Sequence, residues 1–252
     1  MKHATRSGRL GMLAVGLGVG AVAATPGTAS ADDIQISIDG VDLFPTAGNT
    51  ATAVSGLGDI AIAIGNGASA NATGGIFDTA FADGTGSAAD TIDGNLASAF
   101  AFGAGSAAYA ESGSLDDATA FGAGSSAYAG FGGSSLDFAS VFGTDSGAEA
   151  GGAGGNFDAA TVIGDHSQAD ALFGNGDHAS VLDTGSAADV ATAGGSATVL
   201  SSNDIAAVAG TGSTATAGAD LAAPGNFDLA VVFGDMLHAI AIGGNFLVDI
   251  LP

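Results

Sequence analysis

The residues most able to do chemistry are aspartates that occupy one position of a repeated segment. Eight of the nine copies carry Asp at this position, and the remaining copy carries Ala97. If the copies stack at the spacing of hydrogen-bonded strands, neighbouring carboxylates lie about 4.8 Å apart and repel by roughly 1 kcal/mol per pair in water. The pattern therefore predicts a group that offsets this repulsion. This Asp column consists of Asp59, Asp78, Asp116, Asp137, Asp158, Asp177, Asp204 and Asp228.

Two kinds of group could offset the repulsion in the Asp column. In the first, each carboxylate caps backbone N–H groups of a turn at the entry to a strand. In the second, the carboxylates hold a cation such as Ca²⁺, which takes several carboxylate and carbonyl oxygens. The known Ca²⁺ roll repeat, G-G-x-G-x-D-x-U-x, is absent, and its absence favours turn capping. We therefore expect no cofactor, with Ca²⁺ as the alternative.

The Asp column belongs to a repeat that aligns on one anchor residue, six residues after each Asp. Positions four and two before the anchor, and five and seven after it, are small, and almost all are Ala or Val. In the seventh copy Ala188 and Val190 take the last two of these positions. This period of two is the period of a β-strand, so each copy predicts a strand, a glycine corner, a second strand and a Gly-rich turn. The anchors are Gly65, Gly84, Gly103, Gly122, Gly143, Gly164, Asp183, Gly210 and Gly234, at spacings of 19 to 27 residues.

The repeat predicts the fold class. One short coil cannot bury its own small residues, but stacked coils can, because each pairs its backbone with the next. Ala suits an interior where two sheets approach closely, and glycine at the corner permits a positive φ. Glycine also interrupts every window of about ten residues, which disfavours helices. We therefore predict an all-β, parallel β-solenoid, a β-roll or β-helix, of about nine coils of 19 to 21 residues with terminal caps.

The residue just before the anchor is mostly apolar, although by strand alternation it should lie on the opposite side of the strand from the Ala and Val columns. Its side chains could be placed in two ways. The glycine corner could swing these side chains inward, or they could form an outward stripe that meets a second copy, since large exposed apolar patches mark interfaces. The candidate self-association stripe consists of Phe102, Phe121, Phe142, Ile163, Leu182 and Phe233.

The pattern A-x-A-[FI]-G-x-x-[SA]-x-A-x-A, clearest in residues 61–74 and 118–130, resembles the head repeats of trimeric autotransporter adhesins. The resemblance spans about residues 57–245. It implies a left-handed parallel β-roll, exposed at a surface, that binds host or matrix components. The Gly- and Ala-rich, Lys-poor composition is also similar to secreted repeat proteins of actinobacteria.

The two ends of the chain differ from the repeats. Residues 1–31 predict a Sec-type signal peptide, with a basic start, an apolar stretch over 10–24 and a cleavage site near Ala31. Residues 32–56 are predicted as an N-terminal cap and lead-in, 57–245 as the solenoid, and 246–252 as an apolar C-terminal cap. The predicted location is therefore secreted or at the cell surface.

The charge excludes several partners. All three basic residues, Lys2, Arg6 and Arg9, lie within residues 1–31. Residues 32–252 would therefore carry all 26 acids without Lys or Arg, a formal charge of −26. Phosphate binding needs cations, so nucleic acid and anionic membrane surfaces are excluded. The partners that remain are a second copy and cell-surface, host or matrix components.

The repeated acids also argue against an enzyme. An active site should be locally unique, whereas these carboxylates recur, so we expect no catalytic residue. The alternative is a carbohydrate-active β-helix enzyme with paired carboxylates, whose cleft would fall in the irregular stretch 190–210. The sequence therefore predicts a secreted or cell-surface, non-enzymatic repeat protein, adhesin-like or structural, with an acidic face. A Ca²⁺-dependent module with an Asp ladder is the second alternative.

Overall fold

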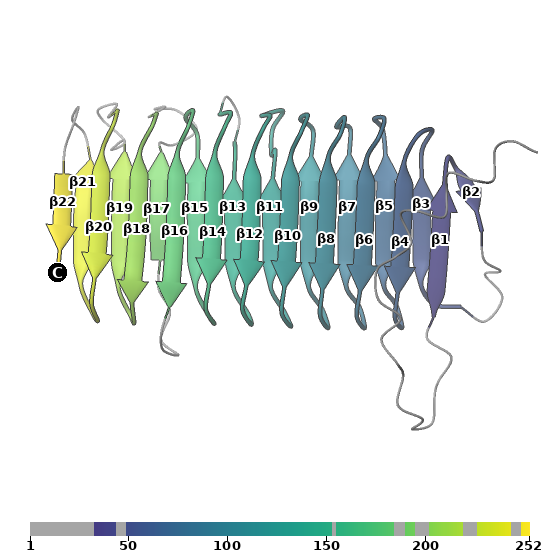
Figure 1. Cartoon of the computed structure of the whole chain (residues 1–252), viewed down its shortest axis with the longest axis horizontal. Coiled ribbons are helices and arrows are strands. Elements are labelled where there is room, and N and C mark those ends of the chain that lie inside the picture. Colours follow the sequence, from purple (N-terminus) through teal and green to yellow (C-terminus); the bar gives the residue numbers. More distant parts are fainter. Residues whose placement is uncertain are drawn as a thin grey trace, which may run out of the picture. The chain divides into compact units, whose positions relative to one another are not determined.

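The computed structural model describes residues 33–43, 49–152, 155–183, 190–194, 202–218, 226–242 and 248–252. Over these ranges the chain is all-β, and it forms a parallel β-solenoid in which successive strands alternate between two sheets from β2 onward (Figure 1). The predicted fold class is confirmed. No helix in the described ranges is long and apolar enough to cross a membrane. The predicted signal peptide, residues 1–31, lies outside the described residues.

The larger sheet, called sheet A here, has the strand order β2-β1-β4-β6-β8-β10-β12-β14-β16-β18-β20-β22. From β4 onward its strands are parallel and in register. Its strands are β1 (Ile34–Ile38), β2 (Val41–Asp42), β4 (Ile60–Ile64), β6 (Thr79–Asp83), β8 (Ser98–Phe102), β10 (Asp117–Phe121), β12 (Phe138–Phe142), β14 (Ala159–Ile163), β16 (His178–Asp183), β18 (Ile205–Gly210), β20 (Leu229–Phe233) and β22 (Val248–Leu251).

The second sheet, sheet B, holds the other strand of each coil and is parallel throughout. Its strands are β3 (Thr52–Ser55), β5 (Ser69–Thr73), β7 (Ala88–Ile92), β9 (Ala107–Glu111), β11 (Ser126–Ala129), β13 (Gly147–Ala150), β15 (Gln168–Leu172), β17 (Val190–Gly194), β19 (Thr214–Gly218) and β21 (His238–Ile242).

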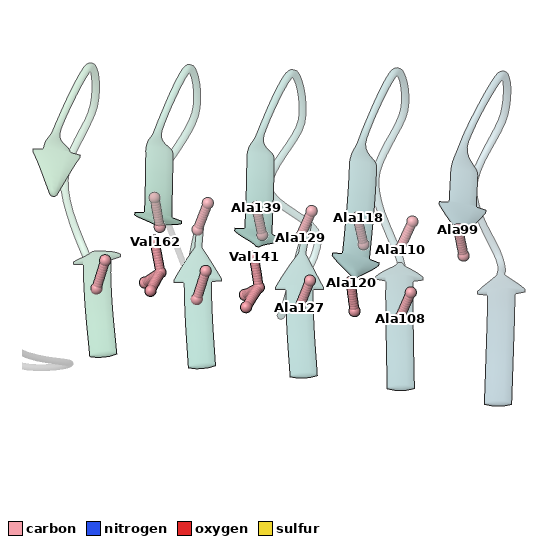
Figure 2. Packing of buried hydrophobic residues seen from close by; sticks show 14 of the residues in the cluster. Ala99, Ala108, Ala110, Ala118, Ala120, Ala127, Ala129, Ala139, Val141 and Val162 are labelled. Carbon is pink, nitrogen blue, oxygen red and sulfur yellow. The ribbon is translucent and has the colours of Figure 1, made fainter. Parts of the chain in front are cut away.

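The interior between the sheets is made almost entirely of Ala and Val. Figure 2 shows these side chains pointing from both sheets into the space between them, with Ala118 and Ala120 on one side and Ala108 and Ala110 on the other. Among the described residues, no Leu, Ile, Phe or Met is fully buried. The narrow interior accepts only small side chains, so the large apolar side chains of this protein lie on its outer surface.

The register of one coil differs from the prediction. The sequence assigned Ala188 and Val190 to the interior, by counting from Asp183. In the structure Val190 pairs with the outward Gln168, and Ala191 and Ala193 are the residues that pair with the buried Ala169 and Ala171. The prediction was wrong here because the turn after Asp183 is three residues longer than in the other coils, and only the pairing with β15 reveals this. Ala188 itself lies outside the described residues.

Six of the eight anchor glycines have the positive φ that was expected of a corner, and Gly143 and Gly210 do not. Gly84, Gly103 and Gly122 have φ of 140°, 125° and 132°. A methyl group on Gly103 would also lie 2.8 Å from the carbonyl of Gly122, one coil on. Both the conformation and the stacking therefore require glycine at this corner.

Gly103→Ala is expected to lower the free energy of unfolding by about 3 kcal/mol or more, because backbone strain and a clash with the next coil add together. The matched control is Gly105→Ala, two residues later, where φ is 66° and no atom lies within 4 Å of an added methyl group. Gly105→Ala should lower the free energy of unfolding by only about 1–2 kcal/mol, which is the cost of the left-handed conformation for a residue with a side chain. Urea denaturation compares the two, and equal losses would show that coil stacking does not limit this position.

The solenoid begins with a strand that runs against the others. β1 pairs antiparallel with β4, and β2 extends the sheet beyond it. On β1 the polar Gln35 and Ser37 point inward and are buried, while Ile34 is 38% exposed on the outer side. At the other end, β22 pairs with β20 and adds a strand to sheet A. Phe246 and Leu247, which the sequence assigned to the cap, lie outside the described residues.

Candidate functional site

The Asp column lies inside the solenoid, at the entry to the strands of sheet A. All eight side chains are no more than 1% exposed. Each Asp stands two residues before the first buried Ala of its strand, so it continues the inward face of that strand. This shared spacing was the sequence signal that the column is internal, and the sequence prediction had not used it.

The carboxylates of the Asp column bind the backbone of the next coil. Oδ1 of Asp59 accepts the N–H of Asp78 at 2.9 Å, and Oδ1 of Asp78 accepts the N–H of Ala97 at the same distance. The bond recurs between later members of the column at 2.9–3.0 Å. The column therefore works as a ladder that ties coil to coil, because each of these bonds reaches the backbone of the neighbouring coil.

Glycine makes room for the second carboxylate oxygen. A methyl group on Gly56 would lie 2.7 Å from Oδ2 of Asp59, and one on Gly155 would lie 2.5 Å from Oδ2 of Asp158. These Oδ2 atoms are buried without a hydrogen-bond partner in the structure. An ionised carboxylate in such surroundings loses its hydration without replacement, which is costly.

Burial accordingly raises the pKa of five of the ladder carboxyls. It raises the pKa of Asp116 and Asp158 to about 7 and that of Asp177 to about 8. The pKa values of Asp78 and Asp137 are also raised, chiefly by burial. The N–H groups from the next coil act in the opposite direction but are outweighed. Bound protons therefore remove much of the repulsion that a stack of carboxylates would otherwise carry.

The geometry of the ladder differs from that of a cation site. Ca²⁺ takes six to eight oxygen ligands. In the described part of the chain, no three His, Asp or Glu side chains come together in a group that could hold a metal ion. Seven of the ladder carboxylates, from Asp59 to Asp204, instead accept a backbone N–H from the next coil. A solenoid whose coils are joined in this way fits a structural repeat protein.

The predicted self-association stripe lies on the outer side of sheet A. Phe121, Phe142, Ile163, Leu182 and Phe233 are 40–58% exposed, and Phe102 is half-buried among its neighbours. The inward alternative is therefore wrong. Neighbouring rings stack along the stripe, with centroids 4.4 Å apart for Phe102–Phe121 and 5.4 Å apart for Phe121–Phe142.

The stripe is part of a larger apolar face, which we define as the outward side of strands β1 and β4 to β20 of sheet A. The outward positions of β4 to β20 carry only two acids, Asp83 and Asp117, and one histidine, His178. A chain with 26 acids thus keeps one sheet face nearly free of charge. Other exposed members of this apolar face are Ile34, Ile60, Phe138 and Ile205.

A further apolar stripe, which the sequence prediction missed, comes immediately before the Asp column. Its bulky side chains have a left-handed backbone, with φ between 59° and 65°, which costs roughly 1–2 kcal/mol per residue. All but the half-buried Leu136 are largely exposed. The recurring tetrapeptides GIFD, GSLD and GNFD were the available signal. This stripe consists of Phe77, Leu96, Leu115, Leu136, Phe157 and Phe227.

The outward side of sheet B has a different character, with Asp90, Glu111, Glu149 and Asp170 among its residues. Two tyrosines, Tyr109 and Tyr128, stack at its centre with ring centroids 4.8 Å apart. Apolar side chains thus dominate one face of the solenoid and acids and tyrosines the middle of the other.

Within the described ranges, one histidine–carboxylate pair forms at the glycine corners. Nε2 of His166 lies 3.9 Å from Oδ2 of Asp145, one coil away, and both side chains are exposed. The neighbouring Ser146 hydroxyl donates to the backbone carbonyl of Thr144 or Gly164 rather than to this histidine. In the irregular stretch 190–210, the described strands β17 and β18 simply continue the stack.

Comparisons of the chain with protein-family models, with curated proteins and with solved structures return no match. The stacked parallel coils are consistent with a repeat β-roll. No family match links them to the heads of trimeric autotransporter adhesins.

Proposed function

We propose that this chain is a secreted or cell-surface, non-enzymatic structural repeat protein that assembles with further copies through its apolar face. The observation that carries the proposal is the orientation of β1. This strand turns Ile34 outward and buries Gln35, whose amide nitrogen and oxygen have no hydrogen-bond partner in the structure.

The orientation of β1 is costly for an isolated molecule. A strand with one buried face normally turns its apolar side inward, and a shift by one residue would exchange the two faces of β1. A buried amide without partners costs about 1–3 kcal/mol per unsatisfied group. Covering Ile34, Ile36 and Ile38 by a second copy would offset this cost, because their side chains would then be removed from water.

The distribution of charge supports assembly through sheet A. Two copies meeting through sheet B would bring Glu111, Glu149 and their neighbours together, and like charges at an interface are unfavourable. The apolar face avoids this, since its outward positions from β4 to β20 hold only two acids. The sheet B side then remains exposed to solvent as the acidic surface that meets cell-surface or matrix components.

The double variant Phe121→Ser/Phe142→Ser is expected to dissociate the assembly. Removing two stacked rings should raise the dissociation constant at least about tenfold, since burying one Phe contributes about 1.5–3 kcal/mol. Tyr109→Ser/Tyr128→Ser, which removes the two stacked rings of sheet B, is the matched control and should leave the assembly intact. Sedimentation velocity across micromolar concentrations measures both.

A wild-type protein that stays monomeric up to high concentration would contradict assembly through the apolar face. Secretion is tested separately by fractionating expressing cells. The proposal requires a product that starts near Asp32 in the medium or on the cell surface, and retention of the whole product inside the cell would overturn it.

A further inference from the structure

A pocket lies where the period of the solenoid breaks. Most coils return from sheet B to sheet A through a short turn, but the turns after β11 and β13 are each two residues longer, which gives the anchor spacing of 21 at Gly122, Gly143 and Gly164. The two longer turns are neighbours in the stack. Between them and the flanking coils opens a pocket of about 300 Å³, lined by Glu111, Tyr128, Phe131, Glu149, Ala150, Gly151, Gly152, Leu172 and Phe173.

Aromatic rings form much of the wall of this pocket. Tyr128 is held by its stack on Tyr109, at 4.8 Å between ring centroids. Phe173 lies against the backbone of Gly152, where an added methyl group would come within 3.2 Å of its ring. Phe131 stands in the longer turn and is 60% exposed. Two rings are thus fixed by packing, and the third is exposed at the pocket.

The charge at this pocket has one sign. Glu111 and Glu149 line it, and none of the nine lining residues is basic. The field of these carboxylates extends to their neighbours: after burial, the charge of Glu149 and then of Glu111 raises the pKa of Tyr128. Burial and then Glu149 also raise the pKa of Asp170 to about 6. Beyond residue 31 the chain has no Lys or Arg, so within residues 32–252 only a protonated histidine could offer this site a full positive charge.

We propose that this pocket binds an organic cation, the guanidinium or alkylammonium group of an Arg or Lys side chain on a basic partner polypeptide. The faces of Tyr128, Phe131 and Phe173 offer cation–π contacts, and the Glu111 and Glu149 carboxylates accept charge-assisted hydrogen bonds. An anion is excluded by the two carboxylates. A bare metal ion is disfavoured because the remaining wall is apolar and offers few oxygens.

The proposal goes beyond the structural role above and does not depend on secretion or on assembly. It requires only the coils that carry β9, β11, β13 and β15. It also assigns a locally unique site to a protein whose other features repeat, since the two longer turns are adjacent in this part of the described stack.

The chain's own tyrosines report on the pocket. The protein has two Tyr and no Trp, and both tyrosines lie on sheet B, one of them in the pocket wall. We expect N-acetyl-arginine methylamide and its lysine counterpart to change tyrosine fluorescence saturably. The citrulline analogue, which has the same shape without the charge, should not. Glu149→Gln should weaken binding about tenfold, the loss of one charge-assisted contact. Asp235→Asn, the same change of charge on a distant exposed corner, should leave binding unaltered.

Three results would overturn the proposal. The first is equal binding of the citrulline analogue, and the second is unchanged affinity in Glu149→Gln. The third is saturation by a neutral sugar such as methyl glucoside with no response to the arginine probe, which would reassign the pocket to a carbohydrate. Phe131→Ala provides a second variant in an exposed turn, where folding is not at risk, and it should also weaken binding of the arginine probe.

Discussion

Raising the pH from about 5 to about 8.5 is expected to lower the free energy of unfolding of this protein, the reverse of ordinary acid denaturation. The reason is the buried Asp ladder. Burial raises the folded-state pKa of Asp116 and Asp158 to about 7 and that of Asp177 to about 8, whereas the unfolded chain releases these protons near 3.8. Between these values the folded state holds protons that the unfolded state does not.

The sign of the effect follows from this difference. The stabilisation is complete below about pH 4 and is lost as the pH rises through 7 to 8. Within that window each such carboxyl lowers the free energy of unfolding by about 1.4 kcal/mol per pH unit. Several carboxyls acting together make this the largest single effect expected for the molecule. Urea denaturation at fixed ionic strength, followed by circular dichroism, measures it.

Two controls separate the ladder from general repulsion among surface acids. Asp177→Asn keeps the oxygen that accepts the N–H of Asp204 but removes the group that titrates. The free energy of unfolding should therefore depend less steeply on pH, by the contribution of about one proton. Asp165→Asn should not, because Asp165 is exposed and hydrogen bonds from Thr144 lower its pKa out of the window. High salt should weaken surface repulsion and leave the buried contribution in place. Stability that is flat or rises from acid to alkaline pH would contradict the protonated ladder.

Ala108→Leu is expected to destabilise the fold by about 3 kcal/mol or prevent cooperative folding altogether. Ala108 is fully buried, and its strand pairs it with Ala89 on one side and Ala127 on the other. Figure 2 shows it pointing into the narrow interior among other alanines. Three additional carbon atoms could be accommodated only by moving the sheets apart, and this would disturb the neighbouring coils as well.

Ala107→Leu is the matched control for this substitution. It makes the same change one residue earlier on β9, where the side chain points outward. A surface substitution of this kind usually changes stability by less than about 0.5 kcal/mol. Thermal and urea unfolding of the two variants should differ clearly, and equal stability would show that the interior is wider than its alanine lining indicates.

The fold could be predicted because the same spacing of small residues and corner residue recurs in nine copies of the repeat. Small residues at a period of two, on both sides of a glycine corner, specify which side of each strand is internal and which neighbours it pairs with. The prediction lost the register only after Asp183, where counting from the anchor assumed a constant turn length. Turn length carries no periodic signal, so pairing of β17 with β15 was needed to place Ala191 and Ala193.

The sequence named the eight aspartates but did not determine their chemistry. Whether a carboxylate at a strand entry points to solvent or to the interior depends on the backbone of the preceding residue. At Phe77, Leu115, Leu136, Phe157 and Phe227 that residue is left-handed, a conformation that bulky side chains rarely adopt and that propensity does not predict. The spacing from the first buried Ala did indicate an inward position, but the raised pKa of the carboxyls follows from their near-complete burial, which only the folded chain shows.

The sequence by itself determined the period, the small interior columns, the corner glycines and the charge of this protein, since these depend on residue type and spacing alone. The tertiary structure decided which face of β1 is buried and that the self-association stripe points outward. It also decided that the longer turns after β11 and β13 adjoin and form a pocket. These properties depend on contacts between residues in different coils. Such contacts exist only after stacking has fixed the register of the coils.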